Sequence, residues 1–282
     1  MTIKKSESLG FQGIDSNIEN KNNYPLVSII TVVFNGESVL EETILSIANQ
    51  VYTNIEYIVI DGNSNDQTVK IIKKYDSVIN QWISQKDDGI YDAMNLGASM
   101  AKGDLIGFLN AGDYLFPHSI SEIANGFNAN NFDYSMGPVI IEDEKGTFVR
   151  VYDPLEKIDL NSNSLTPMPS AHMAIYMKKI FFDSLNGFDL NFKLSSDYDL
   201  IIRAMAVSSN VWYFENNLGV FKTGGASGSF KTHFENYKVY KKHSVPFFIR
   251  IKGLFFSIFK ALVKIFVSKK LILILKSFFN FK

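Results

Sequence analysis

The chain contains no cysteine among its 282 residues. This absence excludes disulfides, zinc–thiolate sites and a thiol nucleophile, and it suits a reducing cytosol. Proline is also scarce, with 7 residues, while 46% of the chain is hydrophobic, which is typical of an ordered globular protein. Residues 1–24 are polar and hold no apolar run, so we expect no secretory signal there and interpret them as a lead-in to the first strand.

Acidic residues are missing from the end of the chain. From Pro246 onward there are eight Lys and Arg residues and no Asp or Glu. Because the whole chain has a formal net charge of −1, the part before Pro246 carries −9. A basic, Phe-rich tail on an acidic body predicts that the tail has a partner of its own, and the acidic body argues against nucleic acid as a ligand.

Long uncharged hydrophobic runs are also absent from this tail. A membrane-spanning helix needs about 20 largely uncharged residues, whereas cations interrupt the apolar runs of residues 246–282. One half of a helical wheel collects the polar residues Arg250, Lys252, Ser257, Lys260, Lys264 and Ser268. This amphipathic pattern predicts a helix lying on an anionic membrane surface. A terminal helix packed on the body, or a contact in a homodimer, would give the same pattern.

What the chain does have is a regular alternation of strand and helix patterns. Residues 26–34, 55–60 and 105–109 are apolar runs that predict buried strands. Residues 37–50 and 90–100 have helical spacing. The alternation predicts an α/β fold with a mostly parallel central sheet and helices on both faces. We expect one domain over residues 25–245, followed by the helical tail of residues 246–282.

Several finer features are also expected. Ser64, with Gln67 three residues later, forms a possible capping box for a helix. Residues 132–141 are expected to form one strand that pairs with a strand at 147–152. Residues 197–208 are expected to form a short helix. The glycine- and serine-rich loop at 224–229 could close over a ligand, although any connecting loop has this composition.

Three aspartates stand where such a fold places its ligands. Asp61 and Asp113 follow predicted buried strands, and Asp197 opens a predicted helix. Ligands of parallel α/β sheets bind beyond the carboxyl ends of the strands. Taken one at a time, however, Asp61 and Asp113 are explained equally well by a turn, and Asp197 is better explained by capping and the helix dipole.

Six motifs taken together favour a functional role for these aspartates, because the motifs occur in the order and at the spacing of a known family. They resemble the family-2 inverting glycosyltransferases of the GT-A fold, in particular the bacterial surface-polysaccharide branch of colanic-acid and O-antigen type. The motifs are VSIITVVFN (27–35), EYIVIDGNSNDQT (56–68), DGIYDAMNLG (88–97), AKGDLIGFLNAGD (101–113), GFD (187–189) and DYDLIIR (197–203). The resemblance covers about residues 25–225, and it implies a Rossmann-like GT-A domain.

The resemblance also implies roles on the donor side. Phe34 matches an aromatic residue that flanks the nucleobase, and Asp61 matches the aspartate that binds the nucleoside. Asp88 matches an acidic position near the donor. Asp113 matches the last aspartate of a motif that binds Mn²⁺ or Mg²⁺. The usual acidic residue before it is Gly112 here, so metal binding would rest on Asp113, the diphosphate and water.

On the acceptor side, the resemblance implies that Asp197 is the catalytic base that deprotonates the acceptor hydroxyl. His172 matches a histidine near the acceptor pocket, although a lone histidine is also common as a structural residue. Asp199 and Arg203 are expected to hold the helix of Asp197 in place.

The function expected from these features is transfer of a hexose, with inversion, from a nucleotide-sugar such as a UDP-sugar. The acceptor would be a hydroxyl of a lipid-linked glycan in bacterial polysaccharide biosynthesis, at the inner face of the cytoplasmic membrane. One alternative is a synthase of polyprenyl-phosphate sugars. A second is a non-catalytic, membrane-docked scaffold, which the departure at Gly112 keeps open.

Overall fold

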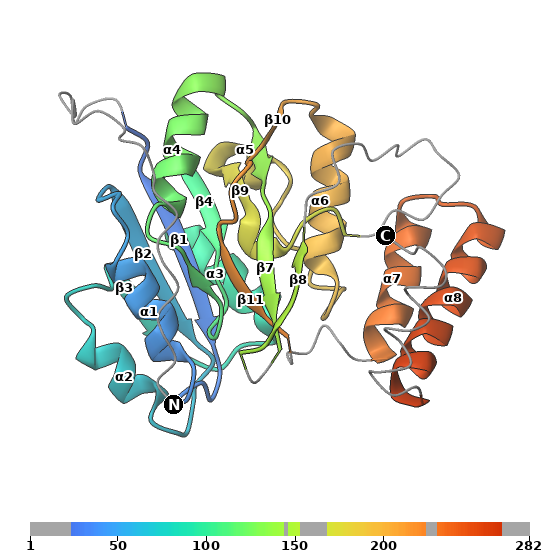
Figure 1. The fold of residues 1–282 in the computed structure, drawn as a ribbon, viewed down its shortest axis with the longest axis horizontal. Helices are drawn as coiled ribbons and strands as arrows, with labels where there is room; N and C mark the ends of the chain where they lie inside the picture. The colour runs from blue at the N-terminus through green and yellow to red at the C-terminus, as the bar shows by residue number, and fades with distance from the viewer. Residues whose placement is uncertain (1–23, 144–145, 153–167, 224–229, 267–282) are drawn as a thin grey trace, which may run out of the picture.

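The computed structural model describes residues 24–143, 146–152, 168–223 and 230–266 (Figure 1). Three of the expectations fall partly or wholly outside these ranges. They are the lead-in of residues 1–24, the loop at 224–229, and the tail from residue 267 onward.

The core is a mixed sheet with strand order β10-β6-β9-β4-β1-β2-β3 within the described residues. The strands are β1 (Val27–Val33), β2 (Ile55–Asp61), β3 (Gln81–Ser84), β4 (Leu105–Phe108), β6 (Tyr134–Met136), β9 (Ile175–Lys178) and β10 (Val211–Tyr213). Strand β1 pairs in parallel with both β2 and β4, while β9 runs antiparallel to its neighbours β4 and β6. The expected mostly parallel sheet is therefore confirmed.

Helices cover both faces of this sheet, as the alternation predicted. Strand β1 shows why, since every residue of it is buried. Ile30 and Val32 pack in one apolar cluster, whereas Ile29 and Val33 pack in another on the opposite face. One face carries α3 (Ile90–Met100), α5 (Lys179–Ser184) and α6 (Ser196–Val207), and the other α1 (Leu40–Ala48), α2 (Thr68–Lys74) and α4 (Ser119–Asn130).

A smaller sheet lies against the second half of the domain. Its order is β5-β11-β7-β8, formed by β5 (Tyr114–Leu115), β11 (Gly219–Lys222), β7 (Val139–Glu142) and β8 (Phe148–Tyr152). The single strand expected at 132–141 was wrong, because it is divided into β6 of the large sheet and β7 of the small one. Gly137 and Pro138 make the division: Pro138 has no N–H for a ladder, and a Cβ on Gly137 would come within 2.7 Å of the Phe214 ring.

The C-terminal part is a helical hairpin of α7 (Phe230–Lys242) and α8 (Phe247–Phe266). Figure 1 shows α7 between α6 and α8, with α8 on the outside of the molecule. The boundary expected at residue 245 falls in the turn between the two helices. Among the described helices, none has the length and apolar character needed to cross a bilayer.

Candidate active site

The first wall of the site is made by the loops that follow β1 and β2, which hydrogen bonds hold together. Asn35, just after β1, has a positive φ of 50°, and its N–H donates to Ser64 Oγ at 2.7 Å. The Gly36 N–H donates to Thr68 Oγ1 at 2.9 Å. These contacts fix the carboxyl ends of the two strands relative to each other, so the residues that follow the strands have defined positions.

Asp61 is the last residue of β2, and it is fully buried. Its carboxylate accepts hydrogen bonds from the Ser64 N–H at 3.1 Å, from Ser64 Oγ, and from Ser84 Oγ at 2.6 Å. The expected capping box at Ser64 is therefore wrong. Helix α2 begins at Thr68, and the Gln67 N–H that such a box needs donates to Glu37 Oε2 at 2.8 Å instead. Three donors fix this carboxylate below the turn.

Phe34 stands at the mouth of this turn. Its side chain is 64% exposed although it directly follows a buried strand. The N–H of Gly62, the residue after Asp61, donates to the Val33 carbonyl at 2.8 Å, and a Cβ on Gly62 would lie 3.5 Å from that of Phe34. Phe34 and Asp61 are thus brought together at neighbouring strand ends, as expected. An exposed ring beside a glycine leaves room for a planar group.

Asp88 is not beside these residues. It is exposed, its N–H donates to an Asp92 carboxylate oxygen at 3.0 Å, and its carbonyl accepts from Lys193 Nζ at 2.8 Å. The carboxylate next to the turn belongs to its neighbour Asp87, whose Oδ2 would lie 2.7 Å from a Cβ on Gly62. The sequence motif places two aspartates in succession, and only the packing shows which of them faces the turn.

Asp113 follows β4 in the chain, and it is 4% exposed. Gly112 has a φ of +102°, which favours glycine. Thr43 Oγ1 accepts from the Gly112 N–H and donates to the Asp113 carbonyl. Asp113 Oδ1 accepts from the Lys222 N–H at 2.9 Å. Burial raises the pKa of Asp113 to about 7, although this hydrogen bond and the charge of Lys222 act in the opposite direction.

His172 lies beside Asp113 and lines a cavity with Asp197. It begins a short 3₁₀ helix, His172–Ala174, and its Nε2 lies 3.9 Å from Asp113 Oδ2. Burial lowers the pKa of His172, although Asp197 acts in the opposite direction, so the imidazole is neutral near pH 7. Within the described part of the chain, His172 Nε2 and Asn110 Oδ1 are buried atoms without a hydrogen-bond partner. Both atoms are therefore free to contact a ligand.

Asp197 lies in the first turn of α6. Its Oδ1 accepts from the Tyr91 hydroxyl of α3 at 2.8 Å and from the Tyr198 N–H at 2.8 Å. Burial raises the pKa of Tyr91, and the Asp197 charge adds to the shift, so Tyr91 keeps its proton. Asp197 and His172 also line one small cavity, with Phe108, Ile175 and Phe188 in its apolar wall. Sequence reasoning identified Asp197 but not its hydrogen-bond donor Tyr91.

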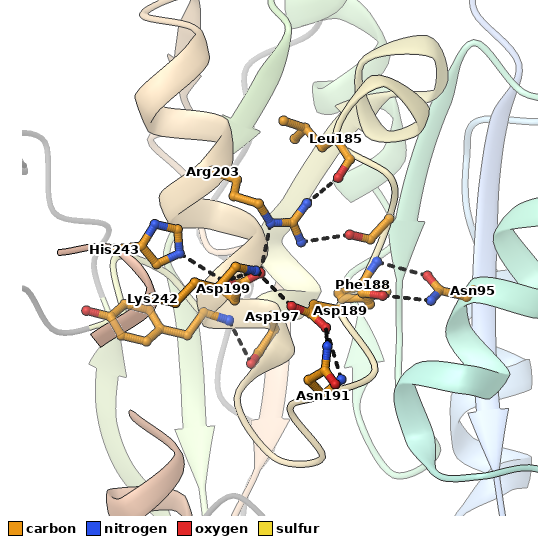
Figure 2. A network of polar contacts seen from close by, with 12 residues as sticks. Asn95, Leu185, Phe188, Asp189, Asn191, Asp197, Asp199, Arg203, Lys242 and His243 are labelled. Atoms are coloured by element: carbon orange, nitrogen blue, oxygen red, sulfur yellow. Dashed lines mark hydrogen bonds and ion pairs between the residues drawn. The ribbon is translucent and has the colours of Figure 1, made fainter. Parts of the chain in front are cut away.

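Helix α6 is held in place by a polar network around the buried Asp199 (Figure 2). Arg203 Nε donates to Asp199 Oδ2 at 2.8 Å, and its Nη2 donates to the Gly187 carbonyl at 2.7 Å. These contacts match the holding role expected for Asp199 and Arg203. Lys242 and His243, at the end of α7, complete the network, and sequence analysis did not identify either of them.

The family model of glycosyl transferase family 2 matches residues 28–183, which is more than half of the chain. The chain belongs to glycosyl transferase family 2. The matched segment contains Phe34, Asp61, Asp87, Asp113 and His172, whereas Asp197 lies beyond it. The colanic-acid or O-antigen branch is not distinguished by this match.

Bacterial relatives of this family-2 chain carry the same general description. An uncharacterized glycosyltransferase of Mycobacterium tuberculosis is 30% identical over 194 residues, 66% of this chain and 71% of the relative. An uncharacterized glycosyltransferase of Haemophilus influenzae is 28% identical over 237 residues, 80% of this chain and 95% of the relative. A PGL/p-HBAD biosynthesis glycosyltransferase of Mycobacterium bovis is 27% identical over 64% of this chain and 70% of the relative.

Solved structures of the same fold come from more distant proteins. Residues 1–349 of S. aureus TarS in complex with UDP superpose with a TM-score of 0.61 at 16% identity, covering 81% of this chain and 69% of that one. The longer TarS structure is covered over only 39% of its length. The Pyrobaculum calidifontis mannosyltransferase PcManGT, in complex with GDP-Man and Mn²⁺, gives a TM-score of 0.55 at 15% identity, covering 78% of this chain and 63% of that one. These likenesses show the fold, a GT-A-like domain.

Proposed function

We propose that this family-2 glycosyltransferase transfers a hexose, with inversion, from a nucleoside-diphosphate sugar to a hydroxyl of a lipid-linked glycan. The observation that carries the proposal is the position of His172. It lies 3.9 Å from Asp113 and lines a cavity together with Asp197. A buried carboxylate for the diphosphate side and a second carboxylate for the acceptor side are thus brought to one place.

The donor would bind between the ends of β1 and β2. The exposed Phe34 ring can stack on a nucleobase, and Asp61 can accept from a base or ribose donor while Ser64 and Ser84 hold it in place. We assign the second donor-side carboxylate to Asp87 rather than to Asp88, because Asp87 lies against Gly62. UDP-sugars are the first donors to test, since TarS has been solved with UDP and with UDP-GlcNAc.

The residues present fit a divalent cation that is held mainly by the diphosphate of the donor substrate. Asp113 Oδ2 and the unpartnered His172 Nε2, 3.9 Å apart, offer an oxygen and a nitrogen ligand. No group of three or more His, Cys, Asp or Glu residues suited to a metal occurs in the described ranges, so the diphosphate and water would complete the coordination. When bound, Mn²⁺ or Mg²⁺ would neutralise the charge that develops on the leaving diphosphate.

The reaction itself would be a single displacement. Asp197 accepts the proton of the acceptor hydroxyl as its oxygen bonds to the anomeric carbon, and the bond between this carbon and the diphosphate oxygen breaks on the opposite side. The Tyr91 hydroxyl orients the Asp197 carboxylate. The neutral His172 would lie where the diphosphate and the acceptor meet, so it would not repel a cation.

Asp197→Asn tests the assignment of the base. Asn keeps an oxygen for the Tyr91 hydroxyl, so the fold should remain, while transfer from a radiolabelled donor falls by about 10²- to 10⁴-fold. Calorimetry with UDP and Mn²⁺ should show unchanged donor binding. Near-normal transfer by the folded variant would exclude Asp197 as the base, and an absence of metal-dependent nucleotide binding in the wild type would favour the scaffold alternative.

The acceptor class needs a separate assay. A lipid-diphosphate-sugar carries the hydroxyl that a base at Asp197 can activate, whereas a lipid phosphate needs no base. Preference for the lipid phosphate, with full activity in Asp197→Asn, would instead identify a synthase of polyprenyl-phosphate sugars.

A further inference from the structure

Helix α8 turns its apolar side away from the protein. Phe248 is 84% exposed and Phe255 is 74% exposed. At 100° per residue, these two residues lie on the same side of the helix as the exposed Ile251 and Phe259. Such an extended apolar surface marks an interaction site rather than ordinary protein surface.

Two residues from the polar half of α8 face the protein instead. The Arg250 guanidinium lies 5.2 Å from the centre of the Tyr237 ring of α7. Ser257 Oγ lies 2.5 Å from Nδ1 of His233, also on α7. This is the reverse of a terminal helix that packs its apolar half on the body, which was one of the alternatives left open by the sequence. Among the described residues, the apolar half is therefore left uncovered and can contact a partner.

The charge of the hairpin indicates which kind of partner fits the apolar face of α8. Within Phe230–Lys242 and Phe247–Phe266 there are eight cations: Lys231, Lys238, Lys241, Lys242, Arg250, Lys252, Lys260 and Lys264. The one carboxylate in these two helices is Glu235, and it is engaged by the Lys193 and Leu194 N–H groups. Lys242 is paired with Asp189 and Asp199, but α8 itself holds four of the cations and no acid. Exposed Phe side chains on a helix of this charge fit acyl chains below anionic headgroups.

We propose that the outer face of α8, formed by Phe247, Phe248, Ile251, Phe255, Phe256 and Phe259, docks the enzyme on a membrane of anionic phospholipids. The apolar side chains enter the acyl boundary. Lys252, exposed between Phe259 and Phe256 on the wheel, reaches the headgroups by its long side chain. The inference rests on the lipid-linked acceptor proposed above only for its purpose, because the surface binds membrane whether or not transfer occurs.

Flotation of the full chain with vesicles tests the proposal. The chain should bind phosphatidylcholine vesicles that contain phosphatidylglycerol, and bind phosphatidylcholine vesicles more weakly. The double variant Phe248→Ser/Phe255→Ser should lose at least about a hundredfold in partitioning, since each lost Phe removes about tenfold. Lys252→Gln should lose about fivefold, and only with anionic vesicles.

A matched control is the double variant Ile180→Ser/Val207→Ser, which removes two residues that are 77% and 70% exposed on α5 and α6. It should partition like the wild type. Retained stabilisation by UDP in a thermal-shift assay shows that each variant is folded, and it separates failure of docking from failure of the donor site.

Equal partitioning of the wild type and Phe248→Ser/Phe255→Ser would overturn the proposal. So would a wild-type chain that stays off the vesicles and sediments as a dimer, which the double variant dissociates, because a second copy would then cover this face. Hydrogen exchange of the wild type, with and without vesicles, needs no variant. Protection at residues 247–259 is expected, and unchanged exchange there in the vesicle-bound protein would contradict the docking surface.

Discussion

Lys242 Nζ lies 2.8 Å from Asp199 Oδ1, so the end of α7 is tied to α6 two residues beyond Asp197 (Figure 2). Asp199 is fully buried, and Lys242 also pairs with Asp189 at 2.8 Å. Burial pushes the pKa of Asp199 upward. Hydrogen bonds from His243 and Lys242, with the charge of Arg203, outweigh burial and lower the pKa to about 2. The hairpin that carries the lipid-docking face is thereby fixed to the helix that carries the proposed base.

Replacing Lys242 should therefore affect chemistry as well as stability. Lys242→Met leaves Asp199 with Arg203 and His243, and because Lys242 is partly exposed we expect a loss of about 1–3 kcal/mol in unfolding free energy. We expect kcat to fall several-fold with the donor KM unchanged, because Lys242 acts through the position of α6.

The control for this experiment is Lys241→Met, which removes the same group from an exposed neighbour. It should resemble the wild type, and Lys242→Arg should restore much of kcat. A Lys242→Met enzyme with lower stability but unchanged kcat would show that the link is structural only.

Tyr91 offers a more direct test of how Asp197 is oriented. Tyr91→Phe removes the hydroxyl that donates to Asp197 Oδ1 and leaves the ring packed in the core. Loss of one such hydrogen bond amounts to about 1 kcal/mol, so single-turnover transfer should slow by about fivefold. Tyr134→Phe is the control, since its buried hydroxyl bonds to the Ser208 carbonyl instead. Equal rates in the two variants would contradict an orienting role for Tyr91.

The raised pKa of Asp113 predicts that the free energy of unfolding depends on pH. Its pKa of about 7 in the folded, metal-free protein lies above the ordinary value of 3.8, so the folded state holds this proton more tightly than the unfolded state. The stability that this carboxyl contributes is present below pH 3.8 and is lost as pH rises to about 7. Asp113→Asn keeps an oxygen for the Lys222 N–H and removes the buried charge.

The metal-free Asp113→Asn variant should therefore be more stable than the wild type above pH 7, by up to about 4 kcal/mol if the whole shift is expressed. The difference should vanish near pH 4. Denaturant titrations in EDTA at several pH values measure it. The same variant should lose Mn²⁺-dependent binding of UDP, and a pH-independent difference in stability would contradict this description of Asp113.

The effects of the two neighbouring aspartates between β3 and α3 can be separated by mutation. Asp87→Asn should weaken binding of a UDP-sugar about tenfold, because the Asp87 carboxylate lies against Gly62 beside the proposed donor site. Asp88→Asn, on an exposed side chain, should change binding by less than about twofold. Calorimetric titration of both variants gives the comparison, and the opposite order would restore the sequence-based choice of Asp88.

The most apolar strands could be predicted from the sequence because the pattern that identifies them lies within a few neighbouring residues. β1, β2 and β4 are short apolar runs buried on both faces, and α3 was predicted with its observed limits of Ile90 and Met100. Helix α4 was missed because its segment is rich in Asn and contains Gly126, which sequence reasoning reads as a loop. Gly126 lies there because a Cβ would collide with the Trp212 ring, a contact that the sequence does not reveal.

In the candidate site, too, some features could be predicted from the local sequence and others could not. Strand ends and helix starts are local features, so Asp61, Asp113 and Asp197 could be singled out from the sequence. Which polar groups face them could not, because those groups come from distant segments. The Lys222 N–H meets Asp113 from a strand 109 residues away, and the Tyr91 hydroxyl meets Asp197 across 106 residues.

The sequence by itself determined the alternation of buried strands and helices, the order of the family-2 motifs, and the two opposed sides of the C-terminal helix. These depend on periodicity and on residue type, which are properties of neighbouring residues. Only the tertiary structure decided that His172 lies beside Asp113, that Asp87 rather than Asp88 faces the turn after β2, and that α8 directs its phenylalanines outward. Each of these depends on which surfaces meet when distant segments pack, and packing is a property of the whole chain.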